Sequence, residues 1–216
     1  MISSFVKQNS SPKWVENGIL IVINRPIYGL ILSGGKSRRM GTDKALINRG
    51  GQSQLAFIMG VIAECVDRSF VSSRSDQVGD SERSQFEQII DRYNGIGPVA
   101  GILSAFDEHP DVDWLIVACD LPNITTKTVQ HLLAHRDGEQ LFTAYMSSFD
   151  SLPEPLCAVY HSSCIDVVRK FVDDGVNCPR KILIRSATRL LEQPDPRALD
   201  NINTPHELQD SVLRAS

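Results

Sequence analysis

The sequence predicts an α/β domain in which helices cover both faces of a largely parallel sheet. From Tyr28 onward, apolar runs typical of buried strands alternate with stretches of helical periodicity. The run 114–119 (WLIVAC) is nearly all apolar, as expected for a central strand that is buried on both faces. A first apolar strand at 28–33 ends in a glycine turn, as strands do in domains that bind ligands at their carboxyl ends.

Strands and helices follow one another in a regular order. We expect strands at 28–33, 69–72, 87–91, 114–119, 140–146 and 156–160. We expect helices at 53–66, 98–107, 126–135, 163–173 and 204–213, the last two flanking a segment rich in Pro and Asp. Ser53 and Thr125 or Thr126 are suited to cap the helices that follow them, and Pro98 suits a first helical position.

The chain divides into an extension at 1–26 and a single domain at 27–216. Within the extension, Ile19 to Ile23 is a candidate strand that could add to an edge of the main sheet. An extension without a function of its own is the alternative. This apolar run is too short for a membrane span or for the core of a signal peptide.

Composition narrows the class of protein. The 216 residues are 42% hydrophobic and 22% charged, which is typical of a globular domain with a substantial core. A net charge of −4 argues against a nucleic-acid partner. The five cysteines contain no C-x-x-C pair, which favours free thiols in a reducing compartment. We therefore expect a cytoplasmic protein with no membrane or nucleic-acid partner.

The turn after the first strand has the chemistry of a polyphosphate cradle. Glycines let backbone amides approach phosphate oxygens, and four cations (Lys36, Arg38, Arg39 and Lys44) follow within nine residues. A P-loop would need a glycine at position 30, which is Leu30, and a dinucleotide fingerprint would need separated glycines. The alternative is an ordinary glycine turn with solvated cations.

Carboxylates follow two further strands. Asp120 stands directly after the WLIVAC strand, and Asp91 ends the strand near 87–91. A carboxylate at the end of a central strand needs a cation or donors, and Mg²⁺ prefers one or two carboxylates together with phosphate oxygens. We therefore expect Asp120 to hold Mg²⁺, with capping of the next turn as the alternative. We find no nucleophile–base pair in the sequence, which fits a direct transfer between phosphates.

The segment LSGGKSRRMGTDKAL resembles the signature of the molybdenum cofactor guanylyltransferases and the wider MobA-like nucleotidyltransferases. The resemblance extends from about Tyr28 to the C-terminus and includes a late motif at 201–205 (NINTP). It implies a Rossmann-like three-layer αβα sandwich of the glycosyltransferase-A-like kind. It also implies functions for three sets of residues. Leu32, Ser33, Gly34, Gly35, Ser72 and Asp91 would contact the nucleotide; Arg39 and Lys44 would hold the triphosphate beside Asp120; Asn201 and Asn203 would face the acceptor.

The activity implied is magnesium-dependent transfer of GMP from GTP to a molybdopterin cofactor, with release of pyrophosphate. Molybdoenzymes or other proteins of cofactor biosynthesis would be its protein partners. Relatives often have Asn near the base, where this chain has Ser72-Ser73, so cytidylyl transfer stays open. Nucleotidyl transfer to a sugar or alcohol phosphate and a non-catalytic nucleotide-binding module are further alternatives.

Overall fold

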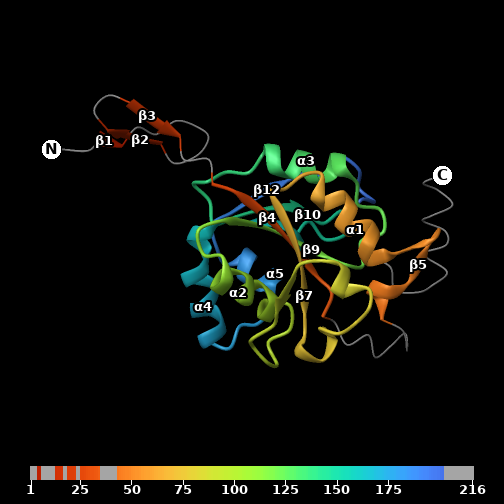
Figure 1. Ribbon diagram of the computed structural model, residues 1–216. Coiled ribbons are helices and arrows are strands. Elements are labelled where there is room, and N and C mark those ends of the chain that lie inside the picture. Colours follow the sequence, from red (N-terminus) through yellow and green to blue (C-terminus); the bar gives the residue numbers. More distant parts are fainter. Residues whose placement is uncertain (1–3, 6–12, 17–18, 23–24, 35–42, 202–216) are drawn as a thin grey trace.

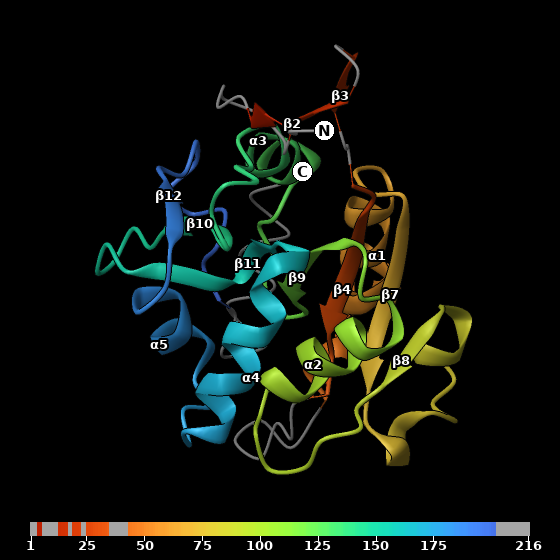
Figure 2. The ribbon, with the colours of Figure 1, turned by 90° about the vertical axis from the view of Figure 1, so that its left-hand side faces the viewer.

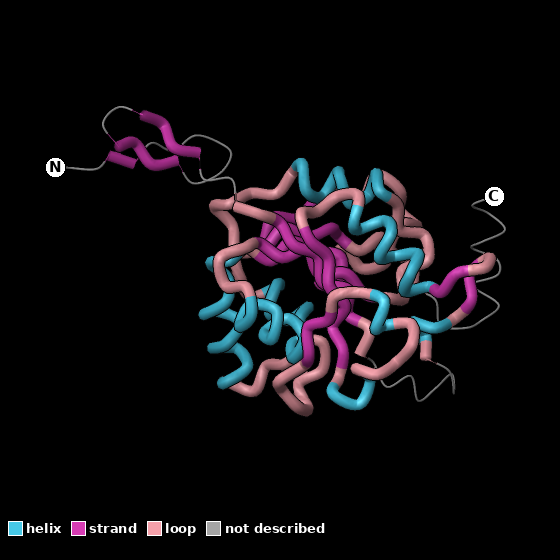
Figure 3. The backbone as a smooth tube through the Cα atoms, viewed as in Figure 1, coloured by secondary structure: helices cyan, strands magenta, loops and turns pink. Residues whose placement is uncertain are grey.

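The computed structural model describes residues 4–5, 13–16, 19–22, 25–34 and 43–201. Its centre is a seven-stranded sheet with the strand order β12-β10-β11-β9-β4-β7-β8 (Figures 1 and 3). The strands are β4 (Ile27–Leu32), β7 (Arg68–Ser73), β8 (Gln88–Ile90), β9 (Asp113–Ala118), β10 (Phe142–Met146), β11 (Pro153–Tyr160) and β12 (Thr188–Leu191).

Six of the seven strands run in one direction and β11 runs against them. The strands β9, β4, β7 and β8 pair in parallel, β11 pairs antiparallel with both β9 and β10, and β12 is parallel to β10. In this register Leu32 lies between Ser72 and Ala118, so the carboxyl ends of β4, β7 and β9 are level. The residues after these three strands therefore share one edge of the sheet, hereafter the carboxyl edge.

Helices cover both faces of the sheet, which gives three layers (Figures 1 and 2). Helices α1 (Gln54–Ala63) and α3 (Thr126–Ala134) pack on one face. Helices α2 (Val99–Glu108), α4 (Ile165–Asp173) and α5 (Pro179–Ile184) pack on the other. Every residue of β9 is buried between these layers. The expected α/β class with a mostly parallel sheet is thus confirmed.

Short elements complete the described chain. Two small antiparallel sheets are formed by β1 (Ser4–Phe5), β2 (Lys13–Glu16) and β3 (Ile19–Val22), and by β5 (Asn48–Arg49) and β6 (Gln52–Ser53). Single 3₁₀ turns are η1 (Lys44–Leu46), η2 (Ser75–Gln77), η3 (Arg83–Gln85) and η4 (Ser162–Cys164). No helix in these described segments is long and apolar enough to cross a membrane.

Local sequence signals explain where the predicted helices begin. The Ser53 hydroxyl accepts from the Ala56 backbone N–H at 2.9 Å, and Thr125 accepts from the Thr128 N–H at 3.2 Å, so both expected N-caps are confirmed. Pro98 lies one position earlier than expected, because it is itself the N-cap of α2. All five cysteines are free thiols.

Three expected features differ from the structure or lie outside it. The strand at Ile19–Val22 exists, but it pairs antiparallel with β2, the segment just before it in the sequence, in a separate sheet and does not add to an edge of the main one. Helix α5 and strand β12 lie within the segment 174–203, to which the sequence analysis assigned no helix or strand. The expected helix at 204–213 lies outside the described residues.

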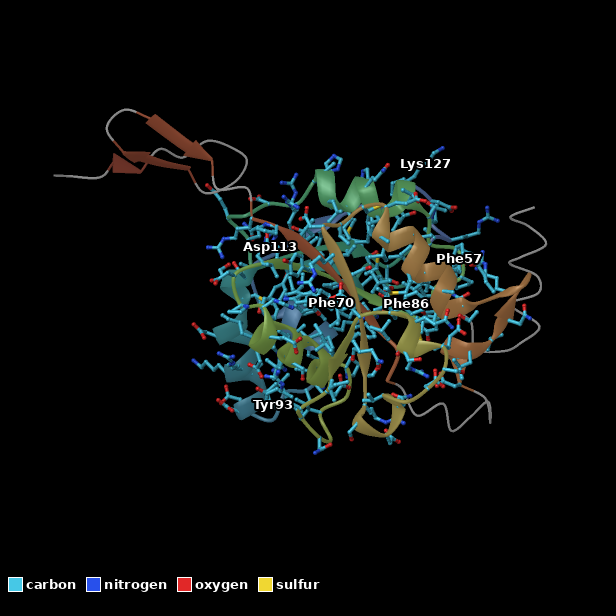
Figure 4. The ribbon with its side chains drawn as sticks, viewed as in Figure 1. Phe57, Phe70, Phe86, Tyr93, Asp113 and Lys127 are labelled. Atoms are coloured by element: carbon cyan, nitrogen blue, oxygen red, sulfur yellow. The ribbon has the colours of Figure 1, made fainter. Side chains whose placement is uncertain are left out.

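A buried Asp–His pair joins β9 to the end of β11 at the opposite edge of the sheet (Asp113 in Figure 4). The Asp113 carboxylate accepts from the Ser162 N–H at 2.9 Å and lies 3.2 Å from Nδ1 of His161, whose Nε2 lies 3.3 Å from the Thr143 hydroxyl. Burial opposes ionisation of Asp113, but the hydrogen bonds and charge of His161 and Ser162 outweigh it, so its pKa is lowered. The ionised carboxylate therefore stabilises the fold.

Replacing Asp113 with Ala should lower the free energy of unfolding at pH 7 by about 2–4 kcal/mol, because two buried donors lose their acceptor. The folded-state pKa lies below the unfolded value of about 3.9, so this contribution is complete above that value and is lost as the pH falls through the folded pKa. Urea unfolding between pH 3 and 7 should show the gap to wild type closing in acid. The exposed Asp111→Ala is the matched control; a gap that is equal at pH 3 and pH 7 would contradict the assignment.

Candidate functional site

Polar residues from four parallel strands meet at the carboxyl edge. Ser33 and Gly34 follow β4, Arg74 follows β7, Asp91 follows β8 and Asp120 follows β9 by two residues. Their meeting is a direct result of the parallel pairing, because parallel strands bring their carboxyl ends to the same edge. The sequence therefore correctly placed three of its proposed positions together, at the ends of β4, β8 and β9.

Gly34 lies near Asp91 and Arg74. A Cβ atom at this position would lie 3.4 Å from Oδ2 of Asp91 and 3.6 Å from Cγ of Arg74, both ordinary van der Waals distances. The Arg74 guanidinium also donates to the Gly34 carbonyl oxygen and forms an ion pair with Asp76. The chain that leaves β4 thus lies beside residues that follow β7 and β8.

The Asp91 carboxylate is held by Ser72 and lies largely out of solvent. The Ser72 hydroxyl donates to Oδ1 of Asp91 at 2.7 Å. Burial raises the pKa of Asp91, while the Ser72 hydrogen bond and the charge of Arg74 act in the opposite direction. Helix α2 packs directly behind this pair: a Cβ on Gly101 would lie 2.4 Å from Oγ of Ser72 and 2.9 Å from Cδ2 of Leu32. Ser72 is thus buried against α2, and its hydroxyl hydrogen is already donated to Asp91.

Lys44 and Asp120 form an ion pair on the other side of Ser33. Their Nζ and Oδ2 atoms lie 3.2 Å apart, and the two side chains are 23% and 27% exposed. Lys44 opens η1, which Asp43 caps by accepting from the Ala45 N–H at 3.0 Å. Beside this pair, burial and the charge of Asp120 raise the pKa of the Cys119 thiol to about 12, so Cys119 stays protonated at neutral pH. A cation and a carboxylate, both accessible to solvent, thus stand together at the strand ends.

Arg83 is a site residue that sequence reasoning missed. It is 1% exposed, and its guanidinium donates to Oγ and the carbonyl oxygen of Ser33, each at 3.0 Å, and to Oδ2 of Asp43 at 2.7 Å. These partners are 50 and 40 residues away along the chain. No local pattern around 75–87 indicates such contacts, and the expectation from composition is that an arginine in a connecting segment is solvated.

A pocket of about 250 Å³ adjoins the Lys44–Asp120 pair. Its lining comes from the end of β9, the start of β11, α5 and the residues before 202: Ala118, Asp120, Leu121, Glu154, Pro155, Leu156, Cys157, Arg180, Leu199 and Asn201. Arg180 in this wall forms ion pairs with Asp150 at 2.8 Å and Glu154 at 3.0 Å. Asn201, expected on the acceptor side, thus lines the same pocket as Asp120.

The remaining predicted site residues lie outside the described segments. These are Gly35, Arg39 and Asn203. Among the residues that the structure describes, no group of three His, Cys, Asp or Glu side chains is arranged to hold a metal ion. Asp120 therefore offers a single, partly exposed carboxylate, a donor set that suits Mg²⁺ when substrate phosphates supply further oxygens.

Known proteins are similar to this chain in sequence over most of its length. A 'Molybdenum cofactor biosynthesis bifunctional protein' of Synechocystis is 37% identical over 86% of this chain, which spans about half (54%) of that relative's length. A 'Probable molybdenum cofactor guanylyltransferase' of Nostoc is 28% identical over 84% of this chain and 88% of its own.

Solved structures show the same fold. The crystal structure of 'Molybdopterin-guanine dinucleotide biosynthesis protein A' from Archaeoglobus fulgidus superposes with a TM-score of 0.68 at 22% identity, over 87% of this chain and 98% of its own. The sequence profile of the 'MobA-like NTP transferase domain' matches residues 29–192, which include the carboxyl edge and most of the sheet. This chain therefore belongs to the MobA-like NTP transferase family.

Proposed function

We propose that this protein transfers GMP from GTP to the terminal phosphate of a molybdopterin cofactor and releases pyrophosphate. The observation that supports this most directly is the Lys44–Asp120 pair, which stands between the glycine turn after β4 and the pocket lined by Asn201. A cation and a carboxylate placed between two binding regions suit the transfer of a nucleotidyl group from one to the other, because they can offset the charge on both phosphates. Two relatives carry the corresponding activity or pathway in their names.

The transfer needs no covalent intermediate with the protein. An oxygen of the acceptor phosphate attacks the α-phosphorus of GTP, the bond from that phosphorus to the bridging oxygen breaks, and pyrophosphate leaves with the bonding electrons. The protein's task is to align the two phosphates and to offset their charge. Lys44, with Arg39 from the signature segment, would bind the triphosphate, and the backbone at Ser33-Gly34 would lie along the nucleotide.

We assign Asp120 as the carboxylate that holds Mg²⁺. It is partly exposed beside the pocket, and one carboxylate together with phosphate oxygens and water is the ligand set that this ion commonly takes. Mg²⁺ bound there would neutralise part of the charge on the phosphates. The same carboxylate lies 3.2 Å from Nζ of Lys44, so the proposed metal ligand and the proposed phosphate-binding cation are neighbours.

The pocket beside Asp120 is our assignment for the acceptor. Asn201 offers an amide that can donate or accept, and Arg180 offers a guanidinium already held by Asp150 and Glu154. Asn203 would extend this side. Because the chain spans about half of the bifunctional relative, any second activity or protein partner of a longer protein is a separate question.

Replacing Asp120 with Asn should lower turnover at least about a hundredfold, because the shape is kept while a preorganised charge is removed. Pyrophosphate release from GTP and molybdopterin, measured across a Mg²⁺ titration, tests this. Asp166→Asn, which changes a side chain that is 92% exposed, controls for the loss of one negative charge. Near-normal turnover in Asp120→Asn would refute the metal assignment.

Replacing Lys44 with Ala should weaken nucleotide binding or slow transfer by about 2–4 kcal/mol, since a charge-assisted contact with phosphate is lost. Lys36→Ala should have the smaller effect, because we expect Lys36 to be solvated. Steady-state kinetics of the two variants give the comparison directly. A greater loss in Lys36→Ala would instead favour a binding geometry closer to that of a P-loop.

GTP should exceed ATP and CTP in catalytic efficiency by tens of fold or more. Guanine would be recognised through its O6 and N1/N2 edge at the ends of β4 and β7, and an unpaired buried polar contact costs about 1–3 kcal/mol. The fully buried Ser73 hydroxyl lies at this position without a hydrogen-bond partner among the described residues. Pyrophosphate release with each of four nucleoside triphosphates and molybdopterin tests both the base and the acceptor; a preference for CTP would indicate cytidylyl transfer.

A further inference from the structure

The buried Arg83 guanidinium connects the two ends of the signature segment. Ser33 ends the strand side of this segment and Asp43 begins the η1 side, ten positions later in the sequence. Arg83 donates to both at hydrogen-bond distance, from Nε and Nη2 to Ser33 and from Nη2 to Asp43. One side chain thus contacts both the residue that follows β4 and the residue that precedes η1.

The contact with Asp43 extends to Lys44. One carboxylate oxygen of Asp43 accepts from Arg83, and the other caps η1 through the Ala45 N–H. Lys44 is the first residue of η1, so the direction in which its side chain leaves the backbone depends on this cap. The contact with Ser33 connects Arg83 to the Asp91 side of the site. The Ser33 hydroxyl donates to the Ser72 carbonyl oxygen at 2.9 Å, and the Ser72 hydroxyl donates to Asp91.

Arg83 is itself held by the core. Phe86, which directly follows η3, packs against the core cluster that includes α1 (Figure 4). Glu82 accepts from the Ser53 hydroxyl at the start of α1. Asp80 lies 3.4 Å from Nη1 of Arg83 and accepts from its backbone N–H at 3.0 Å. The guanidinium is thus presented by a fixed turn and can impose a position on its partners.

We propose that Arg83 is a positioning residue for nucleotide binding, which holds Ser33 at the end of β4 and, through the Asp43 cap, Lys44 at the start of η1. The proposal rests on the nucleotide role assigned above to Ser33 and Lys44. A guanidinium is suited to the task because it donates along several fixed directions at once, which a lysine ammonium cannot do in the same plane. Arg83 touches neither reacting atom and acts through Ser33, Asp43 and Lys44.

A general loss of stability is the competing explanation, and the chain offers a matched control for it. Asp80 contacts the same guanidinium but does not touch the signature segment. Asp80→Asn removes the charge opposite Nη1 of Arg83, keeps a side-chain oxygen that can accept from the Glu82 and Arg83 N–H groups, and leaves the bonds of Arg83 to Ser33 and Asp43 in place. Arg83→Lys removes the paired geometry at both ends, and Asp43→Asn, at a partly exposed position, removes one end and provides a second variant if Arg83→Lys folds poorly.

Hydrogen–deuterium exchange on the full chain without nucleotide tests the positioning. Arg83→Lys and Asp43→Asn should speed exchange across residues 30–46 at least about tenfold, the scale expected for loss of a charge-assisted hydrogen bond. Peptides from β9 and α2 should match wild type, and Asp80→Asn should leave 30–46 unchanged. The proposal is overturned if 30–46 exchanges as in wild type in both variants, or speeds up only together with β9 and α2.

Nucleotide kinetics test the consequence. With whichever nucleoside triphosphate the wild type uses, Arg83→Lys should raise KM at least about tenfold, and by a larger factor than it lowers kcat. The double variant Arg83→Lys/Asp43→Asn should have a KM no higher than that of the more impaired single variant, because both changes remove the same contact. An unchanged KM in a folded Arg83→Lys overturns the inference while leaving the proposed function intact. A wild type that uses none of the four triphosphates refutes the proposed function, and the exchange experiment still decides whether Arg83 positions the segment.

Discussion

A buried guanidinium must have its N–H groups paired, and at the carboxyl edge this requirement determines the arrangement of most other polar groups. Arg83 cannot sit at 1% exposure unless Ser33, Asp43 and Asp80 turn their oxygens toward it. Each of those residues in turn fixes a neighbour: Ser33 meets Ser72, and Asp43 caps the turn that begins with Lys44. A continuous series of contacts therefore runs from Asp91 through Ser72, Ser33, Arg83 and Asp43 to Lys44 and Asp120.

The two carboxylates at the ends of this series of contacts, Asp91 and Asp120, lie in different environments. At the Asp91 end partial burial raises the pKa of the carboxylate, whereas at the Asp120 end the ion pair with Lys44 is about a quarter exposed. A half-buried, hydrogen-bonded carboxylate is suited to a fixed wall, and an accessible one is suited to exchange partners during a reaction. The two aspartates thus differ in chemistry although both follow strands of the same sheet.

Sequence reasoning located the parts of the site that follow from local pattern and parallel pairing. Gly34, Asp91 and Asp120 each end an apolar strand, so their meeting at one edge needed no knowledge of the helices. The role of Arg83 could not be predicted in this way, because its partners are 40 and 50 residues away along the chain and no nearby residue pattern indicates these contacts. The sequence analysis also did not predict the direction of β11, because pairing with β9 and β10 rather than local pattern sets it. It did not predict α5 and β12 either, which lie in the segment rich in Pro and Asp.

Because β11 runs antiparallel to its neighbours, the two halves of the carboxyl edge are formed by different parts of the chain. Because β11 runs against its neighbours, its first residues, Glu154 to Cys157, reach the carboxyl edge, while its last meet Asp113 at the opposite edge. The wall of the pocket is thus built mainly from β11, α5 and the residues before 202, and the opposite side of the edge from β4, β7 and β8, with β9 between them. Substitutions that reshape one side need not disturb the other, so the two sides of the edge can vary independently in sequence.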